Sequence, residues 1–151
     1  RDSSTSRGLG DVYKRQMLNY PFDEIKPDTL YMGDETAFLF ETEIILNNEG
    51  PQYLQDFFLR NGNLLPTLNL GVMAGTRTVL MEYLGMMVKL ITEAKLKFKQ
   101  GDERYQLGTF EMAISNYVAY EYFQGRLIHG RKVTSFFSGF QPHSSAWFKH
   151  K

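Results

Sequence analysis

Apolar residues recur at intervals of three and four between Thr76 and Lys99, and charged residues occupy the other side of the same stretch. The apolar positions are Val79, Leu80, Tyr83, Leu84, Met87, Leu90 and Ile91, and the charged positions are Arg77, Glu82, Lys89 and Glu93. This spacing matches the period of an α-helix that buries one face. We therefore expect a long amphipathic helix that packs against a sheet.

An apolar segment from Leu64 to Met73 comes directly before this helix, with Gly71 near its end and Gly75 just after it. A short apolar run bounded by turn residues is typical of a buried strand. Glycine lets the backbone approach a ligand where a Cβ would obstruct it. The sequence therefore predicts a strand, a glycine turn and a helix start in succession, which is a geometry typical of a binding site.

The remaining patterns predict shorter elements in mixed order. We expect a strand at Thr29–Met32 that Gly33 and Asp34 end, an extended segment at Thr36–Leu46, a helix over Pro51–Arg60 that Asn61 and Gly62 end, a helix over Thr109–Phe123, and strands at Arg126–His129 and Lys132–Phe137. This order is α/β with a mixed sheet. Since open sheets usually contain about four to six strands, we expect this chain to be part of a larger domain.

The first sixteen residues differ from the rest of the chain. Arg1 to Gln16 is rich in Ser, Gly and Arg and shows neither helical nor strand periodicity. As a string it resembles a translated sequencing adapter; a natural disordered or targeting arm is the alternative, although no apolar core of a secretory signal is present. We therefore divide the chain into a disordered leader, 1–16, and part of a domain, 17–151.

Composition excludes several classes of function. The chain has 151 residues, with 17 basic and 17 acidic side chains, so no overall positive field would attract nucleic acid. It has no cysteine, which excludes disulfides and thiolate metal sites. No apolar run is long enough for a membrane span, and the chain is expected to be soluble. Its compartment stays open between the cytoplasm and membrane attachment through a segment outside this chain.

Several motifs occur in an order that resembles a known family. They are Asn19-Tyr20-Pro21-Phe22, Leu68-Asn69-Leu70-Gly71 with Gly75, Glu111-Met112-Ala113 with Asn116-Tyr117, and the closing His150-Lys151. Together they resemble the C-terminal half of GT-A-type glycosyltransferases, which use nucleotide-diphosphate sugars. The resemblance implies a partial, Rossmann-like GT-A fold whose N-terminal nucleotide-binding half is missing. It also implies an Asp-x-Asp metal motif shortly upstream of Met17.

The resemblance further implies roles for individual residues. Asn69, Gly71 and Gly75 would lie against the donor sugar, and Glu111 with Asn116 would face the reacting sugar or acceptor. Where relatives commonly carry Asp, this chain has Glu111, whose carboxylate would take the acceptor hydroxyl's proton or stabilise positive charge that develops at the sugar. His150 would complete a Mn²⁺ or Mg²⁺ site, and Lys151 would pair with phosphate. Purely structural alternatives remain open: a packed turn for Gly75, a helix-start carboxylate for Glu111 and a solvated tail for His150.

We therefore expect a fragment of a glycosyltransferase that moves a sugar from a nucleotide-diphosphate donor to a hydroxyl of a glycan, lipid or protein. Alone, it is expected to be inactive. The alternative is a noncatalytic carbohydrate-binding or interaction module, and a third, weaker alternative is a complete small α/β domain of unrelated role. No phosphate-binding loop, dinucleotide fingerprint, zinc-protease motif or nucleophile elbow occurs in the sequence.

Overall fold

The computed structural model describes residues 23–41, 50–106, 110–134 and 145–148. In chain order these residues form strand β1 (Leu30–Phe38), the 3₁₀ turn η1 (Leu39–Glu41), helix α3 (Gln52–Asn61), strand β2 (Pro66–Ala74), helix α4 (Arg77–Lys99), the 3₁₀ turn η2 (Glu103–Tyr105), helix α5 (Phe110–Tyr122) and strand β3 (Leu127–His129). The predicted leader and the turn at Asn19–Phe22 lie outside the described residues.

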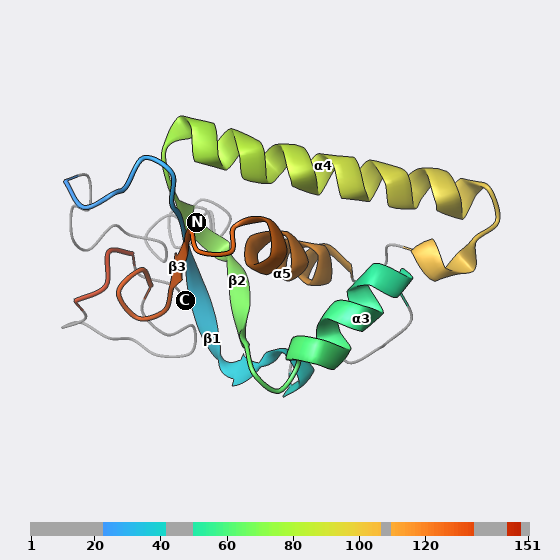
Figure 1. The fold of residues 1–151 in the computed structure, drawn as a ribbon, viewed down its shortest axis with the longest axis horizontal. Helices are drawn as coiled ribbons and strands as arrows, with labels where there is room; N and C mark the ends of the chain where they lie inside the picture. Colours follow the sequence, from blue (N-terminus) through green and yellow to red (C-terminus); the bar gives the residue numbers. More distant parts are fainter. Residues whose placement is uncertain (1–22, 42–49, 107–109, 135–144, 149–151) are drawn as a thin grey trace, which may run out of the picture.

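The sheet is mixed, which confirms the predicted α/β class (Figure 1). The strand order is β2-β1-β3; β1 runs antiparallel to β2 and parallel to β3. Its three strands within the described ranges are fewer than the four to six expected of a complete open sheet. Beyond them, an isolated parallel bridge joins Thr134 to Phe148.

The pairing of β1 with β2 is interrupted by a bulge in β2. Met32 lies opposite Met73, but the next β1 residue, Gly33, lies opposite Asn69. Three β2 residues, Leu70 to Val72, therefore lie between the partners of two consecutive β1 residues. Bulges of this kind redirect side chains and occur often beside active sites. Gly71 is the central residue of this bulge.

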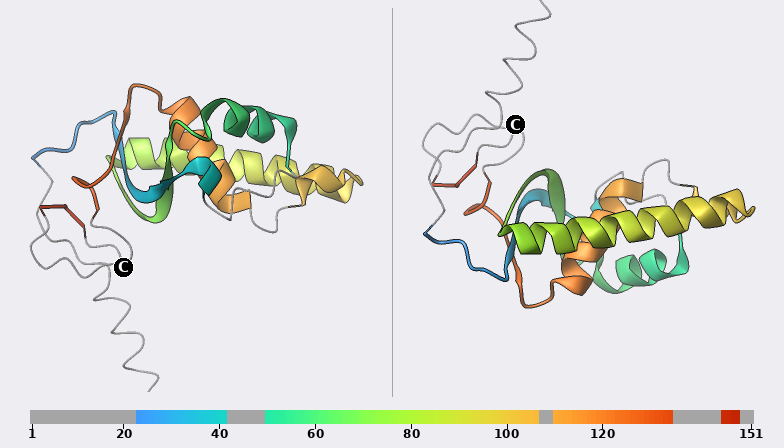
Figure 2. Two further views of the ribbon diagram at one scale, coloured as in Figure 1. Left: turned by 90° about the horizontal axis from the view of Figure 1, so that it is seen from below. Right: turned by 90° about the horizontal axis from the view of Figure 1, so that it is seen from above.

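Helices α3, α4 and α5 form the second layer, with α5 between the other two (Figures 1 and 2). Their shared core is apolar and also includes Leu30, Met32 and Leu68 from the sheet. The buried α4 residues are Val79, Tyr83, Met87, Leu90 and Ala94, at the helical spacing that the sequence predicts. The other face of the sheet carries a smaller cluster in which the Tyr31 and Trp147 rings lie 5.0 Å apart.

The long predicted helix is confirmed as α4, and the helices predicted over Pro51–Arg60 and Thr109–Phe123 are confirmed as α3 and α5. Thr76 begins α4, because its hydroxyl oxygen accepts from the Val79 N–H and donates to the Pro27 carbonyl at 2.7 Å. One side of α4 differs from the prediction: Leu84, expected in the core, is 48% exposed. None of the helices in the described part of the chain has the length and apolar character needed to cross a membrane.

Three strand predictions differ from the structure in their extent within the described residues. Gly33 and Asp34 do not end the first strand, since β1 continues through them to Phe38 and both residues pair with β2. Phe38 is also the last strand residue of the segment predicted as extended over Thr36–Leu46; Leu39–Glu41 is a 3₁₀ turn, and 42–46 lie outside the described residues. Of the last predicted strand, Lys132–Phe137, the described residues are a turn at Lys132 and Val133 and the isolated bridge residue Thr134, and 135–137 lie outside the described residues.

Candidate functional site

Asn69 is a buried polar residue without a hydrogen-bond partner in the part of the chain that the structure describes. It lies in β2 and is 3% exposed, and neither its Nδ2 nor its Oδ1 has a hydrogen-bond partner among the described residues. The hydroxyl of Thr134, also 3% exposed, is unpartnered in the same way. Buried polar groups are nearly always hydrogen-bonded. An amide and a hydroxyl that lie close together without partners therefore indicate a site where a ligand or a water molecule would supply the missing hydrogen bonds.

Gly33 brings these two polar side chains together. A Cβ built on Gly33 would lie 2.2 Å from Thr134 Oγ1 and 2.6 Å from Asn69 Nδ2. Both distances are far inside van der Waals contact, so any larger residue would displace one or both polar groups. Asn69, Thr134 and Gly33 therefore form one polar cluster, which we call the Asn69 cluster.

The bulge in β2 lies directly beside the Asn69 cluster. Its residues, Leu70 to Val72, are half-buried, whereas Asn69 itself is buried. The bulge is therefore more exposed than the cluster beside it. At the centre of the bulge Gly71 has no side chain, and its predicted contact with a donor sugar stays a prediction.

Gly75 has a packing role at the turn into α4. A Cβ on Gly75 would lie 3.2 Å from the Thr29 carbonyl oxygen and 3.3 Å from Val79 Cγ1. These contacts are tight enough that the packed-turn alternative accounts for this glycine. Its predicted contact with a donor sugar stays a prediction.

The structure does not bring Glu111 and Asn116 together. Glu111 lies in the first turn of α5 with its side chain exposed, where the helix dipole favours a carboxylate. Asn116 is fully buried and its amide is engaged: Oδ1 accepts from the Leu68 N–H at 2.7 Å, and Nδ2 donates to the carbonyls of Leu68 and Met112. These bonds give Asn116 a structural role, and its catalytic role stays a prediction.

The predicted metal and phosphate residues, His150 and Lys151, lie outside the described residues. Within the described ranges, no three side chains of the metal-binding types come together. The described residues therefore do not fit a Mn²⁺ or Mg²⁺ site by themselves, and we route no chemical step through a metal.

Comparisons of the chain with family models, with curated proteins and with solved structures found no match. The site must therefore be judged from its own geometry.

Sequence reasoning missed two members of the Asn69 cluster, Gly33 and Thr134. For Gly33 a signal was present, because a glycine inside an apolar strand pattern often marks a close approach of another group. For Thr134 no local signal existed, since it lies 65 positions from Asn69 in the chain and only the fold brings the two together.

Proposed function

We propose that this chain is part of a glycosyltransferase and that the Asn69 cluster binds the sugar of a nucleotide-diphosphate donor. The observation that supports this most is the buried, unpartnered amide of Asn69 beside the bulge at Gly71. Sugar hydroxyls both donate and accept hydrogen bonds. Two neighbouring hydroxyls of one sugar therefore match the Oδ1 and Nδ2 of Asn69, which have no partner among the described residues. The order of the motifs around Asn69, which resembles that of GT-A-type glycosyltransferases, supports the proposal as well.

The reaction proposed is transfer to a hydroxyl acceptor. The acceptor oxygen forms a bond to the anomeric carbon of the sugar, and the bond from that carbon to the diphosphate breaks. A base takes the acceptor's proton, and the nucleotide diphosphate leaves. The family resemblance assigns the base to Glu111, whose carboxylate is exposed in the first turn of α5. Asn69 and Thr134 hold the sugar during this exchange.

A second candidate is a module that binds carbohydrate without catalysis. The same unpartnered amide favours it, because sugar binding needs only Asn69 and its neighbours. The two candidates differ in what precedes Met17 in the gene: a transferase requires a strand ending in Asp-x-Asp, and a binding module does not.

The test uses the complete product of the gene that encodes this chain. We expect it to release nucleotide diphosphate from one member of a panel of donor sugars in the presence of Mn²⁺. Asn69→Leu removes the amide at nearly constant volume and should lower this rate about tenfold or more, the effect of losing one or two hydrogen bonds. Asn63→Ala is the matched control, since Asn63 is exposed in a turn.

Two outcomes contradict the transferase. One is an upstream sequence without Asp-x-Asp; the other is a complete product that releases no nucleotide diphosphate from any donor. If that product instead binds sugar in a way that Asn69→Leu abolishes, the noncatalytic module is supported.

A further inference from the structure

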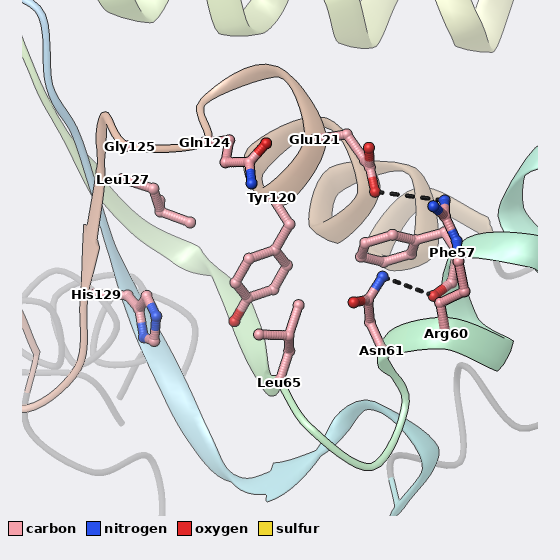
Figure 3. Close-up of a pocket in the computed structure, with 10 residues that line it drawn as sticks. All are labelled: Phe57, Arg60, Asn61, Leu65, Tyr120, Glu121, Gln124, Gly125, Leu127 and His129. Carbon is pink, nitrogen blue, oxygen red and sulfur yellow. Dashed lines mark hydrogen bonds and ion pairs between the residues drawn. The ribbon is translucent and has the colours of Figure 1, made fainter.

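A cavity of about 490 Å³ lies on the helix side of the sheet, between α3, the end of α5 and β3 (Figure 3). Seven of the residues that line it carry the argument: Phe57, Arg60, Asn61, Tyr120, Glu121, Gln124 and His129. Its volume falls in the range of small-molecule sites. Asn69, Gly71 and Gly75 do not line it, so this cavity is separate from the Asn69 cluster.

His129 is held in one orientation at the edge of this cavity. Its Nδ1 lies 2.9 Å from Asp34 Oδ2, across the parallel pairing of β3 with β1. An ionised carboxylate only accepts, so Nδ1 is the donor in this pair, and Nε2 is an acceptor when the ring is neutral. The His129 side chain is 29% exposed. A ligand in the cavity can therefore reach an imidazole nitrogen that a neighbouring strand has already oriented.

Tyr120 forms an aromatic wall beside His129. Their rings meet edge to face with centroids 5.9 Å apart. Figure 3 draws both side chains at the cavity. The Tyr120 hydroxyl donates to the Pro66 carbonyl at 2.6 Å, so it does not compete for Nε2. Burial, and secondarily the Asp34 charge, raise the pKa of Tyr120, which keeps this hydroxyl protonated. Tyr120 thus offers a fixed ring surface.

The other polar groups around the cavity are neutral or cancel in charge. Asn61 Nδ2 donates to the Phe57 carbonyl, which leaves Oδ1 as an acceptor. Gln124 places an exposed primary amide at the rim. Arg60 and Glu121 form an ion pair at 3.7 Å and offset each other. Together with the Asp34 carboxylate that pairs with His129, these groups disfavour binding of an anion. They suit a neutral ligand that both donates and accepts hydrogen bonds.

We propose that the cavity is a binding site for a neutral polyhydroxyl molecule of monosaccharide size, with a ligand hydroxyl donating to His129 Nε2. Gln124 supplies a second polar contact, and the Tyr120 ring covers the apolar side of the ligand. Asp34 is a positioning residue, because it acts on the ligand through His129. The proposal is independent of the proposed transferase, since none of its residues belongs to the Asn69 cluster.

The test is a titration of the isotope-labelled chain with methyl α-D-glucopyranoside and with myo-inositol, followed by imidazole nitrogen resonances. We expect Nδ1 of His129 to be the protonated nitrogen and Nε2 to shift saturably with at least one of the two ligands. Inorganic phosphate should leave Nε2 unchanged. No shift with either ligand at about 50 mM, where a 1 mM site would be saturated, overturns the proposal, as does a saturable response to phosphate alone.

Three variants locate the ligand. His129→Phe should weaken binding about tenfold, the effect of one lost hydrogen bond. Gln124→Ala should weaken it several-fold, whereas Gln100→Ala, an exposed glutamine at the end of α4, should not. Unchanged affinity in both His129→Phe and Gln124→Ala overturns the site. If His129→Phe does not fold, Gln124→Ala against Gln100→Ala decides.

Discussion

Asn116 binds both backbone groups of Leu68. The Leu68 N–H donates to Asn116 Oδ1 at 2.7 Å, and Asn116 Nδ2 donates to the Leu68 carbonyl at 3.1 Å. A side chain of α5 thus pairs with β2 as a further strand would, which satisfies backbone groups at the edge of the sheet. Asn69, one residue along β2, is equally buried but has no partner in the described structure. Because only one of these two buried asparagines has hydrogen-bond partners, we expect opposite effects on stability when each is replaced.

Replacing Asn116 with Leu is expected to lower the free energy of unfolding by about 3 kcal/mol, because two buried backbone groups of Leu68 lose their partners. Urea denaturation measures this change. Asn63→Ala, at an exposed position, should stay near the wild-type value. A fully stable Asn116→Leu variant would show that the paired amide does not hold α5 to β2.

Replacing Asn69 with Leu should leave the free energy of unfolding unchanged or raise it by about 1 kcal/mol, since the substitution removes an unpartnered buried amide. Residues that serve binding often cost stability in this way. The same urea experiment measures it. A loss comparable to that of Asn116→Leu would mean that the Asn69 amide has a structural partner, and would remove the main support for a ligand at that amide.

Gly33→Ala and Gly85→Ala are expected to change stability in opposite directions. At Gly33 the new methyl would overlap Thr134 and Asn69, and both are buried with little room to move, so we expect a loss of about 2 kcal/mol. At Gly85, inside α4, a Cβ meets no atom within 4 Å, and alanine should add about 0.5–1 kcal/mol through helix propensity. Thermal unfolding of both variants checks the signs, and equal effects would contradict the close packing described at Gly33.

Stability should fall at high pH through Tyr83. Burial raises the pKa of Tyr83 to about 12, although its hydrogen bond with Ser115 acts in the opposite direction. Unfolded tyrosine titrates near about 10, so the folded state keeps the proton longer. The contribution of the protonated Tyr83 to the free energy of unfolding is fully present below about pH 10 and is lost as the pH rises through about 12.

Unfolding measured from neutral pH to pH 12 tests this dependence. Tyr83→Phe should be less stable at neutral pH by about 1 kcal/mol, because Ser115 loses its partner, but should lose less stability in the alkaline range. Tyr122→Phe, at a side chain that is 43% exposed, should follow the wild-type curve. If Tyr83→Phe and wild type lose stability equally above pH 10, burial does not hold the Tyr83 proton.

The sequence predicts the helices well because their signals are local. In α4 the apolar spacing, the Thr76 cap and the basic last turn all lie within the helix itself. Leu84 is the exception: it lies at the edge of the apolar face, where the position of the neighbouring elements decides burial. Helix boundaries at Asn61 and Lys99 likewise follow residues next to them in the chain.

The site is less predictable because its contacts are distant in sequence. The local sequence predicts a strand end at Gly33, but β1 continues because Gly33 and Asp34 pair with Asn69 and Leu68 of β2, which lie 36 and 34 positions away in the chain. The family resemblance predicts a catalytic role for Asn116, whereas its amide forms hydrogen bonds with Leu68, 48 positions away in the chain. Asp34 and His129 are 95 positions apart, and no local pattern links them.

Resonances of the Asn69 side-chain amide, followed while donor is added to the complete gene product, test most directly whether this residue binds the sugar. We predict that the Asn69 Nδ2 signals move when nucleotide-diphosphate sugar and Mn²⁺ are added and stay in place with nucleotide diphosphate and Mn²⁺ alone. The Asn63 amide signals should stay in place in both titrations. Unchanged Asn69 signals while the donor binds the same protein would contradict the proposed donor-sugar site.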